Sequence, residues 1–162
     1  MRPVEIPLAL VAAIRAHARE TYPDECCGFL IALPDPPGPH EPRTVVEIRR
    51  APNRFDGERR RRFVIRPEEL REAEVASEGT GRVVAGFYHS HPDHPARPSA
   101  FDQEHAWPWY TYVVVAATST SEPGIGAFEL DGESGVFREV PLRPSSRADA
   151  RVTETLRAPG AR

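Results

Sequence analysis

The chain has little cysteine, no long apolar segment and no excess of positive charge, and each of these absences excludes a class of protein. Its two cysteines, Cys26 and Cys27, are adjacent, so they make a poor disulfide and indicate a reducing compartment. No apolar run approaches the roughly 20 residues of a membrane-spanning helix. The formal net charge of −3 argues against a general nucleic-acid binder, whose domain is usually basic.

The N-terminal segment does not read as a signal peptide. It is too charged after Ile14, and it lacks a clear cleavage site. We therefore expect a cytoplasmic protein with neither nucleic-acid nor membrane partners. The 162 residues, of which 40% are hydrophobic and 28% charged, suit one globular domain with a core of ordinary size.

Periodicity and turn residues predict one α/β domain over residues 1–142, with a mixed, mainly antiparallel sheet flanked by two or three helices. Helices are predicted at residues 6–21, 67–79 and 99–107. Strands are predicted at residues 27–32, 44–48, 63–65, 82–88, 110–117, 125–130 and 136–140. Loops are predicted at residues 33–42 and 51–62, and residues 143–162 form a polar tail that we predict to be disordered.

The segment HSHPDHPARPSAFD, residues 89–102, carries the residues that point most clearly to chemistry. His89 and His91 lie two apart at the end of an apolar strand, so their rings point to the same face and can meet one ion. Asp102 follows after a proline-rich loop. Two histidines, one carboxylate and an open fourth position form the usual catalytic zinc arrangement, and zinc lowers the pKa of water in that position towards ~7.

Each part of this segment also has a purely structural interpretation. One H-x-H pair is a weak sign of a metal, and Ser99-x-x-Asp102 is also a helix capping box. The combined pattern H-x-H-x7-S-x2-D should arise by chance with odds of roughly a few in 10⁴ over this chain, so we favour the metal site. His94 and His105 are assigned to a loop and a helix face, and Cys27 to the core rather than to a nucleophile.

A hydrolytic zinc site needs a base that takes a proton from water and passes it to the leaving amine. Glu25 is the candidate because it precedes the apolar run CGFLIA, where burial and a metal would change its proton affinity. Taken alone, Glu25 has the simpler interpretation of a surface residue that follows a helix.

Two segments, Pro23–Ala32 and Ala85–Asp102, resemble the signature blocks of the JAMM (MPN-plus) metalloprotease family. Those blocks consist of a Glu before a Cys-Gly-hydrophobic strand, then H-x-H-P and S-x2-D, and the resemblance covers about residues 6–141. It implies an MPN/JAMM-like, cytidine-deaminase-like sandwich. It further implies one Zn²⁺ per chain on His89, His91 and Asp102, Glu25 as general acid/base, and Ser99 as the hydroxyl that stabilises the tetrahedral intermediate.

The resemblance also implies a reaction and a substrate. Members of the family cleave isopeptide or peptide bonds after a Gly-Gly terminus, and the short spans between the blocks indicate the compact bacterial branch. We therefore expect zinc-bound water to hydrolyse the amide bond after the Gly-Gly tail of a ubiquitin-like sulfur-carrier protein. The sequence leaves open the carrier, the leaving group and the oligomeric state, a homodimer included.

Two other classes of function compete with this one. A non-catalytic MPN scaffold would lack metal ligands, whereas all five family residues are present here. A zinc nucleobase deaminase would need an H-x-E…P-C-x-x-C signature, which adjacent cysteines do not form. The Arg59–Arg62 run is interpreted as a solvated loop, with contact to an acidic protein as the alternative.

Overall fold

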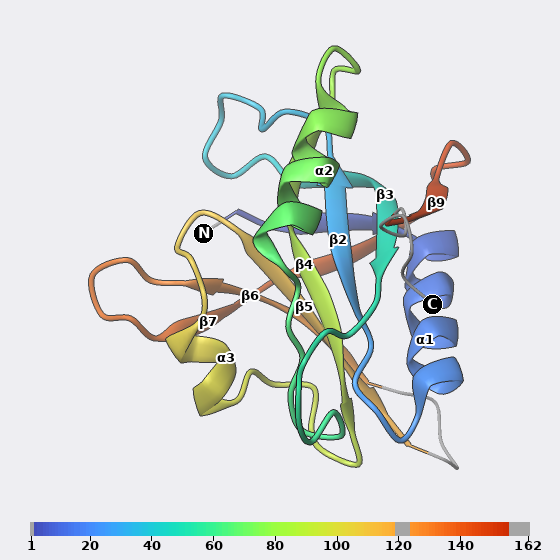
Figure 1. Ribbon diagram of the computed structural model, residues 1–162. Coiled ribbons are helices and arrows are strands. Elements are labelled where there is room, and N and C mark those ends of the chain that lie inside the picture. Colours follow the sequence, from blue (N-terminus) through green and yellow to red (C-terminus); the bar gives the residue numbers. More distant parts are fainter. Residues whose placement is uncertain (1, 119–123, 156–162) are drawn as a thin grey trace.

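One mixed sheet forms the centre of the computed structural model, which describes residues 2–118 and 124–155 (Figure 1). Its strands follow the order β7-β6-β5-β4-β2-β3-β1-β8, and β9 pairs with β3. The strands are β1 (Val4–Pro7), β2 (Cys27–Ala32), β3 (Arg43–Ala51), β4 (Val83–Pro92), β5 (Thr111–Ala117), β6 (Ile125–Leu130), β7 (Phe137–Val140), β8 (Leu142–Ser145) and β9 (Arg151–Glu154). The helices are α1 (Leu8–Thr21), α2 (Pro67–Ser77) and α3 (Ala100–Glu104).

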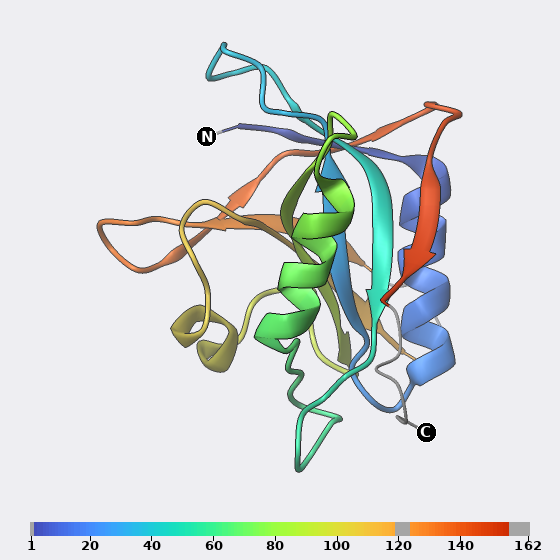
Figure 2. The same cartoon turned by 45° about the horizontal axis from the view of Figure 1, so that its top comes forward.

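Helices α1 and α2 cover opposite faces of this sheet, as Figure 2 shows from above. Successive side chains of a strand point to opposite faces. Leu30 of β2 accordingly packs in the same cluster as Ile14 of α1, whereas Phe29 packs in the cluster of Ala73 of α2. All six residues of β2 are buried, which explains its unbroken apolar sequence. The predicted single α/β domain with helices flanking a sheet is confirmed.

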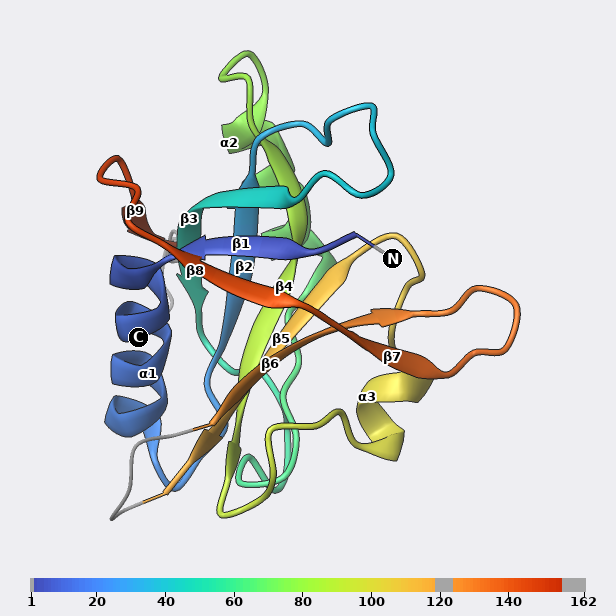
Figure 3. The ribbon, with the colours of Figure 1, turned by 180° about the vertical axis from the view of Figure 1, so that it is seen from behind.

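Parallel and antiparallel pairs are interspersed across the sheet. β2 is antiparallel to both β3 and β4, and β6 is antiparallel to both β5 and β7. β4 runs parallel to β5, and the pairs β1–β3, β1–β8 and β3–β9 are also parallel. In Figure 3, which views the molecule from behind, β1 and β8 run across β2 and β4. The long strand β3 connects these two groups of strands, because its first residues pair with β1 and its later residues with β2.

Most predicted elements differ from the structure only at their ends. The buried residues of α1 include the predicted set Leu10, Val11, Ile14 and Ala18, but the helix begins at Leu8 because β1 extends through Pro7. Helix α3 ends at Glu104, before the predicted limit at residue 107. Pro108 disfavours helical backbone angles at the residue that precedes it, so the helix does not extend that far. Among the described residues, no helix is long and apolar enough to cross a membrane.

The strand predicted at Phe63–Ile65 is wrong. The backbone N–H of Val64 donates to Oδ1 of Asn53 at 3.3 Å, so a loop side chain holds this segment in place of a neighbouring strand. The ring of Phe63 stacks on His89 with centroids 4.5 Å apart. The apolar residues of this segment therefore reflect packing beside a histidine of the site.

The disorder predicted from residue 143 is wrong for residues 143–155. Strand β8 spans the predicted boundary and pairs with β1, and β9 pairs with β3. Both strands are short and expose most of their side chains, so backbone hydrogen bonds hold them and the sequence shows no apolar pattern. The rest of the predicted tail, residues 156–162, lies outside the described residues.

A close approach of β4 to β5 fixes the strand that carries both histidines. The two strands pair from Gly86 opposite Thr111 to Pro92 opposite Ala117. A Cβ added at Gly86 would overlap the backbone carbonyl of Thr111. Glycine is thus required here by the distance between two backbones.

Replacing Gly86 with alanine should destabilise the fold by about 1–3 kcal/mol or more, because a backbone atom must move to admit the methyl group. Chemical denaturation of Gly86→Ala and wild type measures the difference. The matched control is Gly124→Ala, where no atom of the described residues lies within 4 Å of the added Cβ. That control should stay within about 0.5 kcal/mol of wild type. Equal stability of all three proteins would show that β4 and β5 tolerate a wider spacing.

Candidate metal centre

The candidate ligands come from strand β4 and helix α3, whose positions Figure 1 shows, and Glu25 lies just before strand β2. Strand β4 extends through both histidines, and His89 and His91 are 1% and 7% exposed. Asp102 lies in the first turn of α3. On the other side of β4, His89 pairs with Cys27 at the start of β2, which places Glu25 close to the same point.

The donor atoms of the three predicted ligands form a nearly regular triangle. Nε2 of His89 lies 3.1 Å from Nε2 of His91, and Oδ2 of Asp102 lies 3.1 Å from each nitrogen. Ligands bound about 2.0–2.1 Å from one tetrahedral ion lie about 3.3 Å from each other. The triangle is close to that spacing, and two imidazoles with a carboxylate are a suitable donor set, so these residues fit a metal ion.

Hydrogen bonds on the far side of this triangle hold two of its members. Nδ1 of His91 lies 3.1 Å from the carbonyl oxygen of Pro95, which can only accept, so Nδ1 carries the proton and Nε2 keeps a lone pair for a metal. Oδ2 of Asp102 accepts the backbone N–H of Ser99 at 2.7 Å, and Oγ of Ser99 accepts the N–H of Asp102 at 3.2 Å. This reciprocal pair confirms the predicted capping box.

His89 is held by packing on its far side. Its Nδ1 is buried and has no hydrogen-bond partner among the described residues, while Phe63 stacks on the ring. Burial lowers the pKa of His89, and the neighbouring Asp102 carboxylate only partly opposes that effect. The ring is therefore neutral at neutral pH, as a metal ligand must be.

The carboxyl group of Asp102 remains ionised. Burial by itself would raise its pKa, but the imidazole nitrogens of His89 and His91 and the N–H of Ser99 around Oδ2 together hold the pKa well below its usual range. An anionic oxygen beside two imidazoles offers a divalent cation both charge and coordination.

Glu25 lies beside the triangle without completing it. The side chain is 2% exposed, and a carboxylate oxygen lies within 4.8 Å of a ring nitrogen of both His89 and His91. Its Oε1 is buried with no hydrogen-bond partner among the described residues. Burial, reinforced by the charge of Asp102 and opposed by Arg62, raises the pKa of Glu25 to about 9. Glu25 could itself reach a metal, but the 3.1 Å contacts favour Asp102 as the carboxylate ligand.

The structure brings all five predicted site residues together. Glu25 and Ser99 line one pocket with His91, and His91 shares the triangle with His89 and Asp102. Their functional roles stay predictions, because assembly alone does not establish ligation or catalysis.

Other predicted residues also have clear positions. His105 forms a 2.8 Å hydrogen bond to the carbonyl oxygen of Phe101, whereas His94 lines the pocket of Glu25. Cys26 and Cys27 are buried free thiols, and burial raises the pKa of both. The interpretation of Cys27 as a small buried residue is consistent with this position.

Asn53 is a supporting residue that the sequence analysis missed. Its side-chain amide donates to the carbonyl oxygens of Glu25 and Arg62, at 3.2 and 2.9 Å. Its Oδ1 accepts the backbone N–H groups of Phe55 and Val64. One side chain thus fixes the arginine-rich loop against Glu25. An asparagine after a proline indicates a turn, but nothing in the sequence indicates a partner 28 residues away.

Comparison with known proteins agrees with this geometry. The family described as prokaryotic homologues of the JAB domain matches residues 7–130. A desampylase of Haloferax volcanii is 37% identical over 107 residues, which cover 63% of this chain and 72% of the relative. The relative is thus similar over the greater part of both chains.

Two solution structures have the same fold. A protein of Desulfitobacterium hafniense superposes with a TM-score of 0.75 at 26% identity, covering 91% of this chain and 94% of its own. A protein of Salinibacter ruber gives a TM-score of 0.65 at 35% identity, covering 90% and 94%. With the family match and the assembled site, these likenesses identify the chain as a member of the prokaryotic JAB-domain family and a hydrolase of the JAMM type.

Proposed function

We propose that this protein is a zinc-dependent peptidase that hydrolyses the amide bond after the Gly-Gly tail of a ubiquitin-like sulfur-carrier protein. The observation that carries the proposal is the 3.1 Å triangle of His89, His91 and Asp102. Two imidazoles and one carboxylate are a donor set that catalytic zinc sites use. A bound zinc ion would supply Lewis acidity and make water a nucleophile near neutral pH.

In this proposal Glu25 moves the proton. Its Oε1 has no partner among the described residues, and a carboxylate oxygen lies within 4.8 Å of both histidine nitrogens. In the proposed reaction the positive charge of a bound metal would favour the ionised form of Glu25, whose carboxylate then accepts a proton from water and delivers it to the leaving amine. Ser99 lines the same pocket, and its Oγ accepts the N–H of Asp102. The Ser99 hydroxyl hydrogen therefore stays available for the developing oxyanion.

The substrate class is supported by the name of the Haloferax relative and by the limited length of chain between β2 and β4. The name of the Haloferax desampylase denotes removal of a ubiquitin-like modifier, which favours a ubiquitin-like partner here. The Gly-Gly tail is favoured because glycine is the residue that best fits a narrow backbone channel. Between β2 and β4 the chain forms strand β3, helix α2 and three connecting loops, with little chain left over to hold a second ubiquitin-like domain.

The metal assignment predicts about one zinc ion per chain in the purified protein. His89→Ala and His91→Ala should each lose most of that zinc, because two remaining donors do not hold the ion in a catalytic site. Elemental analysis of the purified variants measures the content. His105→Ala is the matched control and should keep its zinc, since His105 bonds to a backbone carbonyl of α3. Unchanged zinc content in both site variants would contradict the assignment of His89 and His91 as zinc ligands.

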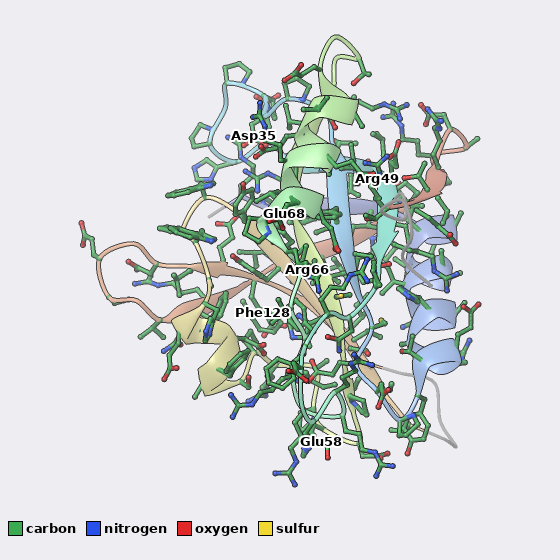
Figure 4. The ribbon with its side chains drawn as sticks, viewed as in Figure 1. Asp35, Arg49, Glu58, Arg66, Glu68 and Phe128 are labelled. Carbon is green, nitrogen blue, oxygen red and sulfur yellow. The ribbon has the colours of Figure 1, made fainter. Side chains whose placement is uncertain are left out.

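Glu25→Gln should keep the fold and the zinc while it loses about 10²–10⁴-fold in turnover, the usual contribution of a general base. Glu58→Gln is the control, since Glu58 is an exposed residue at the tip of the arginine-rich loop (Figure 4). Its turnover should equal that of wild type. Steady-state kinetics on a carrier–Gly-Gly–X fusion supplies both values. If Glu25→Gln kept near-normal turnover, another residue would have to be the base.

The substrate assignment predicts efficient cleavage of carrier–Gly-Gly–X fusions and poor cleavage of Lys-linked di-ubiquitin. Binding energy would come from the carrier body and its extended tail, and no long insertion is available to hold a second ubiquitin. Both substrates are compared at equal concentration by mass spectrometry. Efficient cleavage of di-ubiquitin, with no cleavage of any carrier fusion, would contradict the substrate and leave the metal chemistry standing.

A further inference from the structure

The pocket beside the metal centre has a positive lining that the proposed reaction does not use. It has a volume of about 410 Å³ and is lined by Glu25, Arg61, His91, His94, Pro95, Arg97 and Ser99. Glu25 is the one carboxylate in that described lining, and the proposed reaction already uses it as the base. Two arginines, Arg61 and Arg97, therefore line the space that a ligand would enter.

Among the described residues several arginines pair with a carboxylate, but Arg61 and Arg97 do not. Arginine–carboxylate pairs elsewhere include Arg43–Asp35, Arg50–Glu20, Arg54–Glu69, Arg82–Glu47, Arg138–Asp131 and Arg147–Asp149. Over residues 2–118 and 124–155, the side chains of Arg61 and Arg97 form no such pair. Their charge is available to a ligand.

The wall that carries Arg61 is attached to the proposed base. The backbone N–H of Glu25 donates to the carbonyl oxygen of Arg59 at 2.8 Å. The amide of Asn53 then links the carbonyl oxygens of Glu25 and Arg62. Arg61 lies between these two attachment points, so the backbone position of this arginine is fixed relative to Glu25.

The wall that carries Arg97 is attached to a proposed ligand. The carbonyl oxygen of Pro95 accepts the Nδ1–H of His91 at 3.1 Å and the backbone N–H of Arg97 at 2.8 Å. The same carbonyl thus orients the histidine and positions the loop of Arg97. The backbone segments that carry Arg61 and Arg97 are thus hydrogen-bonded to Glu25 and to His91, respectively.

The chemistry of the leaving group indicates what these cations bind. A base that returns its proton to the leaving amine must touch that amine. Glu25 also lines a second pocket, but the pocket of Arg61 and Arg97 contains the proposed ligand His91 too, so we take the leaving group to enter it. When the leaving amine is the α-amine of a terminal amino acid, a carboxylate lies two bonds from the nitrogen. When it is the ε-amine of a lysine within a protein, four methylenes follow and no negative charge is near. Guanidinium groups pair with carboxylates through charge-assisted, often bidentate, hydrogen bonds.

We infer that Arg61 and Arg97 form a carboxylate-binding subsite for the leaving group. The enzyme accordingly prefers to release an α-amino acid with a free carboxylate over an amidated residue or a lysine side chain. This inference rests on the proposed function, because it takes Glu25 as the group that protonates the leaving amine.

The test uses three fusions of one ubiquitin-like sulfur carrier. The first ends in Gly-Gly-Ala with a free carboxylate, the second in the same sequence with a carboxamide, and the third joins the terminal Gly to the ε-amine of an N-acetyl-lysine amide. Wild type should cleave the free acid with a kcat/KM roughly 10–150-fold above that of the carboxamide, the range of a hydrogen bond to a charged group. The lysine-linked fusion should resemble the carboxamide.

Arg61→Gln and Arg97→Gln should reduce that ratio, mainly by raising KM for the free acid, and Arg97→Lys should restore part of it. Arg60→Gln is the matched control: Arg60 is an exposed neighbour that does not line the pocket, so the ratio should be that of wild type. Equal kcat/KM for acid and carboxamide in wild type would overturn the subsite and leave the peptidase assignment intact. Equal losses on both substrates in the arginine variants would also overturn it.

A binding measurement tests the carboxylate subsite separately from the proposed substrate class. The inactive Glu25→Gln variant is titrated with labelled acid and carboxamide fusions, and fluorescence anisotropy gives the two Kd values. Tighter binding of the free acid supports the subsite, and equal binding overturns it. If wild type cleaves none of the three fusions and the variant binds none of them, the proposed substrate class fails, and the subsite fails with it.

Discussion

The contact of one carboxylate oxygen with two imidazoles is the interaction on which the site depends. Oδ2 of Asp102 lies 3.1 Å from Nε2 of both His89 and His91, and the same oxygen accepts the backbone N–H of Ser99. It thereby connects the last residues of β4 to the first turn of α3. The strand is in turn fixed by β2 on one side and β5 on the other. A loss of that pairing would separate the ligands even with every side chain intact.

Burial gives the neighbouring carboxyl groups different properties. Asp102 and Glu25 are both removed from water, but the histidines and the Ser99 N–H compensate Asp102, and its pKa falls well below its usual range. Glu25 has a buried oxygen with no hydrogen-bond partner in the described part of the chain, and burial raises its pKa to about 9. Two carboxyl groups whose environments separate their proton affinities are typical of sites that need one as a ligand and another to carry protons.

The sequence predicted the centre of the fold and the site better than the edges. β2 and β6 have the predicted bounds, and in β2 the continuous apolar residues mark a strand buried on both faces. Gly86 and Asn53 were not singled out, because their roles depend on Thr111 and Glu25, which are distant in the sequence. The strands β8 and β9 were missed since their side chains are mostly exposed, and Phe63–Ile65 was misassigned because its apolar residues pack on a histidine.

Anomalous diffraction at the zinc absorption edge, from crystals of the wild-type protein, would locate the metal directly. We expect one strong peak per chain, about 2.0–2.2 Å from Nε2 of His89, Nε2 of His91 and Oδ2 of Asp102. Glu25 should lie near the peak without coordinating it. A peak bound by Glu25 in place of Asp102, or zinc held only elsewhere on the chain, would contradict the account.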